Sequence, residues 1–223
     1  MFKILVLDGG GVKGTMPAAL LAHLEEGLKG KKIADYFDLI VGTSTGGIIG
    51  IGLGLGLSAR EILSFYEDDG PSIFRKNWIE EKIPDPLQAI LQLFLTKYKQ
   101  EPLRIALKKR FGNKRLGDSE KRLVIPSINA DTGAPYLYKT PHSFQYKNDW
   151  RHSTVDIALA TSAAPTFFPV HINQDGLPLI DGGLWANNPI MVAVLEAYCI
   201  LKQPFEDIRI LSLGCTRAHP ISI

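Results

Sequence analysis

The chain has 223 residues, of which 45% are apolar and 22% are charged, a composition typical of one globular domain with a sizeable core. Its formal net charge of +2 gives no overall reason to expect a nucleic-acid partner, although a local basic face can still meet anionic lipid. The two cysteines, Cys199 and Cys215, have neither C-x-x-C spacing nor a histidine cluster. We therefore expect no metal, no cofactor, no disulfide framework and a reducing, cytoplasmic location.

Two apolar stretches bear on membrane insertion. The run at residues 2–7 is too short for a signal peptide, and Asp8 ends it. The longest stretch, residues 46–57, is interrupted by glycines and is shorter than the about 20 residues that a membrane-spanning helix needs. We therefore expect no segment that crosses a bilayer.

Hydrophobic periodicity, capping residues and glycine or proline breaks predict strands and helices that alternate along the chain. The expected strands are 2–7, 36–41, 122–128, 136–138, 177–180 and 208–213. The expected helices begin near Thr15 and residue 47, run over 58–66, 87–98, 102–112 and 153–164, and begin again near Pro189. This alternation predicts a single α/β domain, residues 1–223, with a mainly parallel sheet. The chain stops soon after a core strand, so we expect the native protein to be longer.

The stretch that organises this pattern is a G-x-S-x-G motif formed by Gly42, Ser44 and Gly46. It follows the buried strand predicted at 36–41 and precedes a helix, which is the context of a nucleophile elbow. The flanking glycines allow a tight turn that presents the serine hydroxyl at a helix N-terminus. A glycine-rich turn without chemistry is the plain alternative, and the strand–turn–helix context favours the nucleophile.

A second glycine-rich stretch follows the first strand. Gly9, Gly11 and Gly14 match the G-x-G-x-x-G dinucleotide fingerprint, but the second strand ends in the serine motif instead of the required acidic residue. A Walker phosphate loop is excluded because Lys13 precedes the last glycine. The remaining functional interpretation is an oxyanion hole, in which the N–H groups of Gly9, Gly10 and Gly11 form one concavity.

A nucleophilic serine needs a base. The motif Asp181-Gly182-Gly183 follows a predicted strand, at the sheet edge where sites in open α/β sheets gather. None of the histidines has a motif around it; they are His23, His142, His152, His171 and His219. At this stage a Ser–His–Asp triad that uses His171 or His219 stays open.

Four ordered motifs resemble those of the patatin-like phospholipases. They are residues 8–14 (DGGGVKG), 42–47 (GTSTGG), 160–169 (ATSAAPTFFP) and 181–189 (DGGLWANNP). Each motif alone is weak, but the four motifs together and in this order are specific, and the resemblance covers nearly the whole chain.

The resemblance implies a three-layer α/β/α fold and a lipid acyl hydrolase of the phospholipase A type with a Ser–Asp dyad. Ser44 would attack the ester carbonyl, Asp181 would take its proton, and Gly9, Gly10 and Gly11 would hold the oxyanion. The implied substrates are phospholipids or other acyl lipids at a transient membrane surface. The alternatives are a Ser–His–Asp esterase and a lipid- or nucleotide-binding module without catalysis. Burial beside apolar groups is expected to raise the pKa of the Asp181 carboxyl.

Two departures from the family pattern carry further expectations. Lys13 stands where the family most often has arginine; it keeps the charge but loses bidentate geometry for a head-group phosphate. The last strand reads SLGC at residues 212–215, where the family usually continues with Thr-Gly. Some bacterial members carry a C-terminal region that senses a cyclic nucleotide, so the resemblance implies such an activator if that region exists.

Residues 74–98 combine large apolar side chains with Pro84-Asp85-Pro86 in the middle. Breaks of this kind suit a mobile cap that touches lipid. The stripe at helical spacing suits an ordinary core-facing helix equally well, so both interpretations stay open.

Overall fold

The computed structural model describes residues 1–74 and 96–215. Within these residues, seven strands form one sheet in the order β5-β6-β3-β2-β1-β7, with β4 also paired to β3. The strands are β1 (Phe2–Leu7), β2 (Leu39–Gly42), β3 (Arg122–Asn129), β4 (Pro135–Lys139), β5 (His171–Ile172), β6 (Pro178–Asp181) and β7 (Ile208–Leu213). β1, β2, β3 and β7 are parallel, whereas β4, β5 and β6 join the sheet through antiparallel pairings.

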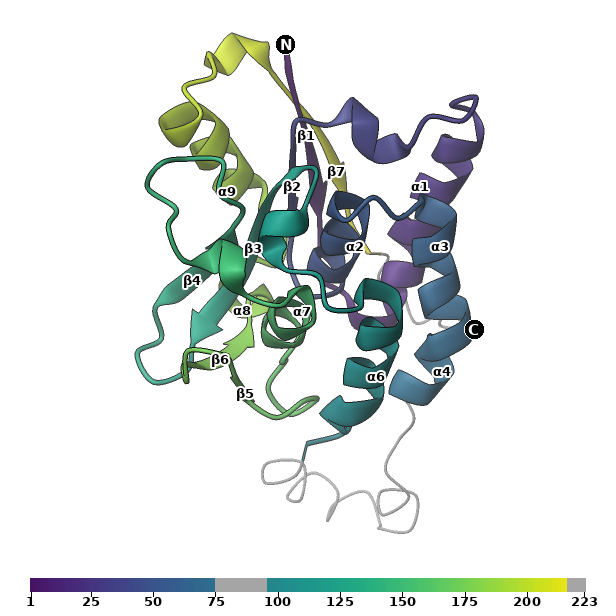
Figure 1. Ribbon diagram of the computed structural model, residues 1–223, viewed down its shortest axis with the longest axis vertical. Helices are drawn as coiled ribbons and strands as arrows, with labels where there is room; N and C mark the ends of the chain where they lie inside the picture. Colours follow the sequence, from purple (N-terminus) through teal and green to yellow (C-terminus); the bar gives the residue numbers. More distant parts are fainter. Residues whose placement is uncertain (75–95, 216–223) are drawn as a thin grey trace, which may run out of the picture.

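Helices cover both faces of this sheet (Figure 1). The α-helices are α1 (Thr15–Glu26), α2 (Thr45–Gly54), α3 (Ala59–Ser64), α4 (Gly70–Ile73), α6 (Gln100–Phe111), α7 (Thr154–Thr161), α8 (Gly183–Ala186) and α9 (Ile190–Leu195). Two π-helical segments are η3 (Phe65–Asp69) and η7 (Glu196–Ile200). The 3-10 turns are η1 (Gly11–Gly14), η2 (Ile33–Tyr36), η5 (Leu116–Asp118), η6 (Asp149–Arg151) and η8 (Phe205–Asp207).

The central strands are apolar on both faces because each face is covered. On β1, Leu5 and Leu7 belong to the larger core, which also contains the buried side chains of α1, α2, α3, α6 and α7. Ile4 and Val6 point the other way, into a smaller core under α9 and η7. This period-two alternation between two cores is what a strand buried on both faces requires. The predicted three-layer α/β/α fold with a mainly parallel sheet is confirmed.

The register of the parallel strands brings the predicted motifs together. Leu7 of β1 lies opposite Gly42 of β2, so the glycine-rich loop and the serine motif leave the sheet side by side. On the far side of β2, the antiparallel pairing of Ser127 with Asp181 places the end of β6 at the same edge. Three motifs that are far apart in sequence therefore meet at one sheet edge.

The structure corrects three details of the predicted elements. The helix that begins after Ser58 does not end at residues 67–71 but continues through η3 and α4 to Ile73. Pro71 lies in the first turn of α4, just after the π-helical segment η3. The short elements β5 and α8 were not predicted. On α1, Leu20 and Leu24 of the expected apolar stripe are exposed.

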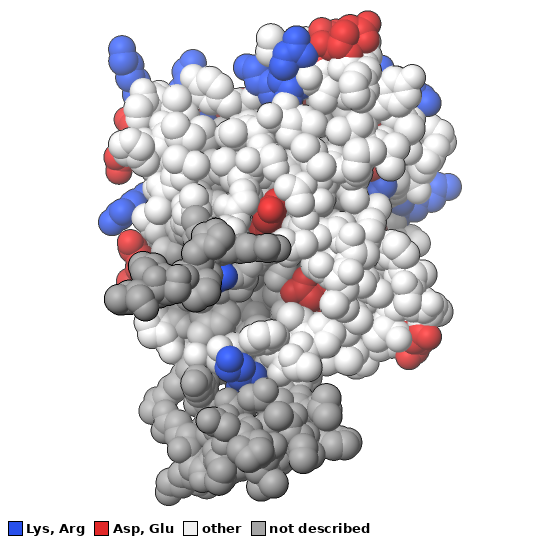
Figure 2. All heavy atoms as spheres, turned by 180° about the vertical axis from the view of Figure 1, so that it is seen from behind, with Lys and Arg blue, Asp and Glu red and all other residues white. Residues whose placement is uncertain are grey.

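The cap or helix expected at residues 74–98 lies outside the described residues, apart from its ends at Phe74 and 96–98. In the described parts of the chain, we find no helix with the length and apolarity that a membrane crossing requires. On the face in Figure 2, the described Lys and Arg residues lie mostly towards the margins, and uncharged residues form most of the middle.

Candidate active site

Ser44 lies on a strained turn between β2 and α2. Its backbone has φ 55° and ψ −121°, a combination that non-glycine residues rarely adopt. The turn is tight because a side chain on Gly42 would overlap the main chain of Gly46, and one on Gly46 would overlap the main chain of Leu7. The G-x-S-x-G sequence is therefore required by sterics, and its strain marks a functional site.

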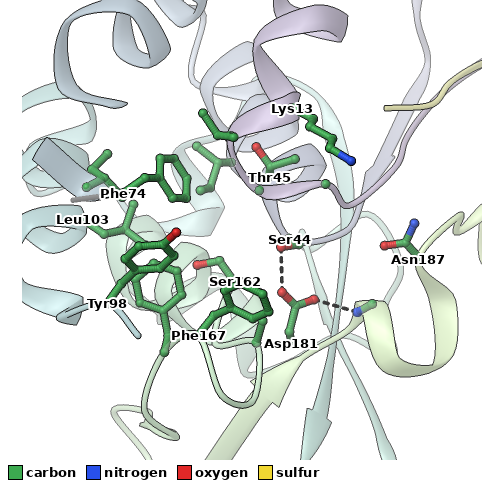
Figure 3. A pocket seen from close by; sticks show the side chains of 18 of the residues that line it. Lys13, Ser44, Thr45, Phe74, Tyr98, Leu103, Ser162, Phe167, Asp181 and Asn187 are labelled. Carbon is green, nitrogen blue, oxygen red and sulfur yellow. Dashed lines mark hydrogen bonds between the residues drawn. The ribbon is translucent and has the colours of Figure 1, made fainter. Parts of the chain in front are cut away.

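The Ser44 hydroxyl donates a hydrogen bond to Asp181, with 2.6 Å between Oγ and Oδ2 (Figure 3). The other carboxylate oxygen accepts the main-chain N–H of Gly183 at 2.7 Å, which fixes the orientation of the carboxylate. Both side chains are buried; Asp181 is only 5% exposed. This pairing has the geometry of a nucleophile with its base.

Burial raises the pKa of Asp181 to about 6, against the opposing effect of the hydrogen bonds from Ser44 and Gly183. The cause is desolvation: taking the charged carboxylate out of water disfavours it, and both of its donors are neutral. The raised pKa agrees with the expectation from sequence. A carboxylate of this kind is a better base than one near its ordinary pKa of 3.8.

The described histidines have other partners than Ser44. His171 bonds to Asp156 at 2.8 Å, and His152 lies 2.9 Å from Asp175. His142 bonds to Glu196, and His23 is an exposed neighbour of Glu26. His219, the other candidate for a triad, lies outside the described residues.

The glycine-rich loop lines the same cavity as Asp181, and its amides are not equivalent. The N–H of Gly9 donates to the main-chain oxygen of Asn187 at 3.0 Å, so it is already engaged. The N–H groups of Gly10 and Gly11 have no hydrogen-bond partner among the described residues, and both glycines line the same cavity as Ser44. Of the three amides expected to bind an oxyanion, two are available.

Ser44 and Asp181 open into a cavity of about 560 Å³. Its wall is mostly apolar and includes Ile48, Phe65, Ile73, Phe74, Tyr98, Leu103, Phe167 and Phe168. Part of this wall is an aromatic cluster, in which the ring centroid of Tyr98 lies 5.7 Å from that of Phe74 and 5.6 Å from that of Phe168. A cavity of this character suits an apolar chain attached to a reactive ester.

Lys13 and Asn187 lie at the polar end of the cavity (Figure 3). Lys13, predicted as a head-group contact, lines the cavity without a salt bridge to any described acid. Gly14, the last glycine of the first motif, has a structural role: a side chain there would overlap Thr45. Gly182 is likewise needed because a side chain would overlap the carbonyl of Pro126.

Sequence reasoning missed several residues that shape the site. Thr161 contacts the main chain of Ser44, and Tyr66 bonds to Thr45 beside it. Tyr66 belongs to η3, and Thr161 comes from a motif whose family resemblance was noted without a role. No local signal identifies either residue, because their partners are distant in sequence. Among the described residues, no group of three or more His, Cys, Asp or Glu side chains has the arrangement of a metal site.

Comparisons with known proteins identify the family of the chain. The patatin-like phospholipase family matches residues 5–194. A cGAMP-activated phospholipase of Escherichia coli is 38% identical over 95% of this chain and 61% of its own length. A cGAMP-activated phospholipase of Vibrio cholerae is 36% identical over 95% of this chain and 63% of its own length. Patatin-like protein 2 of rice is 34% identical over 98% of this chain and 62% of its own length.

The chain thus spans somewhat over three-fifths of the length of these relatives. Among solved structures, VipD from Legionella pneumophila matches 96% of this chain and 50% of its own length with a TM-score of 0.57 at 15% identity, a likeness of fold. The extent of the family match and the identity to the relatives lead to one conclusion: the chain belongs to the patatin-like phospholipase family.

Proposed function

We propose that this protein is a lipid acyl hydrolase that cleaves carboxylic esters of phospholipids with a Ser44–Asp181 dyad. The observation that carries the proposal is the 2.6 Å hydrogen bond from Ser44 Oγ to Asp181 at the polar end of a mostly apolar cavity of about 560 Å³. The family membership supports the same activity.

The geometry supports a two-step acyl transfer. Ser44 Oγ attacks the ester carbonyl while its proton passes to Asp181, and the negative charge on the carbonyl oxygen is met by the N–H groups of Gly10 and Gly11. The leaving alcohol takes the proton from Asp181, which leaves an acyl-serine. Asp181 then takes a proton from water, whose oxygen attacks the acyl carbon, and returns the proton to Ser44 Oγ as the fatty acid departs.

The substrate class follows from the lining of the cavity. Its apolar wall suits the acyl chain, and Lys13 at the polar end supplies a positive charge for a head-group phosphate. Lysine acts as a point charge, so the contact is tolerant of phosphate orientation. Phospholipids carry both features.

A membrane surface is the proposed partner. Three exposed apolar side chains from separate segments surround the mouth of the cavity: Val12 at 52% exposure, Phe167 at 45% and Leu184 at 61%. Lys13 lies among them, so this rim combines apolar area with positive charge, as contact with anionic lipid requires. The proposed location is the cytoplasm, with transient binding to the membrane.

This contact is tested with Leu184→Glu and a matched control, Ile105→Glu. Both side chains are 61% exposed, but Ile105 belongs to α6 and does not line the cavity. In a Ser44→Ala background, Leu184→Glu should weaken sedimentation with vesicles of phosphatidylcholine and phosphatidylglycerol, whereas Ile105→Glu should not. Equal binding by the two variants would contradict the proposed surface.

The hydrolase proposal is tested by covalent labelling with a fluorophosphonate and by a panel of phospholipids. The wild type should label at Ser44 and release fatty acid, and Ser44→Ala should do neither. A non-catalytic lipid or nucleotide carrier would not label. Loss of labelling on replacing His171 in a folded protein would instead favour a Ser–His–Asp esterase.

Regulation by a cyclic nucleotide is proposed from the two bacterial relatives, whose names describe them as cGAMP-activated. The matching segments cover 61% and 63% of those relatives, so the test uses the full-length native protein. Hydrolysis of phospholipid vesicles should rise on adding the cyclic dinucleotide, and an unchanged rate would remove this part of the proposal.

A further inference from the structure

The end of α7 touches the main chain of both members of the dyad. The N–H of Ser44 donates to Oγ1 of Thr161 at 3.0 Å. Two residues further along, the carbonyl of Ala163 accepts the N–H of Asp181 at 3.0 Å. One short segment thus holds the nucleophile and its base, although they lie 137 residues apart in sequence.

The Thr161 hydroxyl has a fixed direction. It donates to the main-chain oxygen of Pro126 at 2.6 Å, and that oxygen can only accept. The proton of Thr161 is therefore committed to Pro126, and its lone pairs are left to accept from Ser44. The side chain is fully buried, so water does not compete for either bond.

Pro126 links this chain of bonds to Asp181. It belongs to β3, where the next residue, Ser127, pairs directly with Asp181 of β6. Thr161 therefore ties the serine turn to the strand that carries the base. The Ser44–Asp181 distance depends on this connection as well as on the two side chains themselves.

The strain at Ser44 explains why such a tie is needed. At φ 55° and ψ −121°, Ser44 is held in a conformation that its own sequence does not favour. Its N–H lies at the start of α2, where no helical carbonyl is available to accept it. Without the Thr161 hydroxyl, this buried N–H would have no partner, and relaxation of the strained turn would lower its free energy.

We propose that Thr161 is a positioning residue that holds the Ser44 hydroxyl in line with Asp181. This inference rests on the proposed hydrolase function. It assigns a task to the ATSAAP part of the third motif, which contributes neither the nucleophile nor the base. Removing the hydroxyl lets the Ser44 main chain move and lengthens the hydrogen bond to Asp181.

Three variants test the proposal on a soluble ester, p-nitrophenyl butyrate. Thr161→Val keeps the shape and removes the hydroxyl, whereas Thr161→Ser keeps the hydroxyl. Thr154→Val is the matched control, because Thr154 is also fully buried on α7 and its hydroxyl also donates to a main-chain carbonyl, that of Lys114 at 3.0 Å. We expect Thr161→Val to lower kcat at least about tenfold with little change in KM, and the other two to stay near wild type.

The pH profile gives a readout that a merely structural role would not change. The hydrogen bond from Ser44 lowers the pKa of Asp181, so weakening it should move the acid limb of kcat/KM to higher pH in Thr161→Val. The limb should stay in place in Thr161→Ser and in Thr154→Val.

A folded Thr161→Val with unchanged kcat and an unchanged acid limb would overturn the inference, as would equal losses in Thr161→Val and Thr154→Val. If Thr161→Val does not fold, Thr161→Cys is compared with Thr161→Ser, because a thiol is a much weaker acceptor of similar size. Cysteine should then lose activity and serine should retain it; equal activity would contradict the proposal. Failure of wild type to label with fluorophosphonate would instead contradict the hydrolase function itself.

Discussion

Two buried carboxylates, one on β6 and one on η7, behave in opposite ways. Asp181 ends β6 and is 5% exposed, whereas Glu196 begins η7 and its side chain is 3% exposed. Burial raises the pKa of Asp181 to about 6. Burial also acts to raise the pKa of Glu196, but hydrogen bonds from its partners outweigh it and leave that pKa below its usual value.

The partners of the two groups explain the difference. Glu196 accepts from Lys139 at 2.6 Å, from His142 at 2.9 Å and from Tyr146 at 2.5 Å. Among the described residues, Asp181 accepts only from Ser44 and from the main-chain N–H of Gly183. A full positive charge beside Glu196 compensates its desolvation, whereas the neutral donors of Asp181 do not.

Equal burial therefore gives one carboxylate with a lowered pKa, Glu196, and one with a raised pKa, Asp181, which is the base of the proposed mechanism. In the proposed mechanism, the raised pKa of Asp181 makes it a better base, and the strained turn positions the Ser44 hydroxyl. Variants of Asp181 should therefore affect mainly activity, and variants of Glu196 mainly stability.

The largest expected effect is on turnover. Asp181→Asn should lower kcat/KM for a phospholipid by about 10³-fold or more, because the amide cannot take the serine proton. Glu196→Gln should leave kcat/KM within about threefold of wild type below its melting temperature, since none of the partners of Glu196 lines the cavity. A hydrolysis assay with circular dichroism as the folding control checks both. An equal loss of kcat/KM in the two folded variants would contradict the different roles assigned to Asp181 and Glu196.

The second effect is on stability and has the reverse pattern. Glu196→Ala leaves the partly buried Lys139 without its carboxylate and should cost about 3 kcal/mol in the free energy of unfolding. The double variant Glu196→Leu/Lys139→Met removes both charges and should recover most of that loss. Urea unfolding of the three proteins measures these energies. A double variant as unstable as Glu196→Ala would mean that packing, not the unpaired charge, is lost.

Much of the site was predictable from sequence because its signals are local. Gly42, Ser44 and Gly46 are close in the chain, and a side chain on Gly42 would overlap the main chain of Gly46 within the same turn. The strand before Asp181 and the direction of its pKa shift also followed from local apolar context.

What could not be predicted depends on distant partners. β5 has only two residues, and its His171 is buried because Asp156 lies opposite. The engagement of the Gly9 amide requires the carbonyl of Asn187, which another motif supplies. Thr161 gains its role from a turn that is 117 residues away. Sequence patterns within a short stretch of residues do not show which distant residues will become partners in the fold.

The third effect is on the pH dependence of stability. The contributions of the two carboxylates to the free energy of unfolding should change in opposite directions as the pH rises. Asp181 has a raised pKa, so its favourable contribution is complete below pH 3.8 and is lost as the pH rises through about 6. Between pH 4 and pH 7.5, the free energy of unfolding of Asp181→Asn should therefore rise relative to wild type by up to about 3 kcal/mol. This is the free energy that corresponds to a shift of about two pKa units.

Glu196 has a lowered pKa, so its contribution is present above its unfolded value of 4.5 and is lost as the pH falls. The advantage of wild type over Glu196→Gln should then shrink on acidification. Thermal unfolding of wild type and both variants at a series of pH values tests the signs. Parallel curves for the two variants would contradict the assigned pKa directions.

The smallest effect concerns two hydroxyl–carboxylate bonds of nearly equal length. Tyr146 donates to Glu196 at 2.5 Å, and Ser44 donates to Asp181 at 2.6 Å. Tyr146→Phe should lower the free energy of unfolding by only about 1.5 kcal/mol, because Glu196 keeps its bonds to Lys139 and His142. The rate of hydrolysis should not change. Ser44→Ala removes a bond of the same kind and should abolish turnover, because the Ser44 oxygen is the proposed nucleophile. Urea unfolding and a lipid hydrolysis assay on both variants measure these effects. A Tyr146→Phe protein that is stable but inactive would mean that Glu196 and its partners contribute to catalysis, and would contradict their assignment to stability alone.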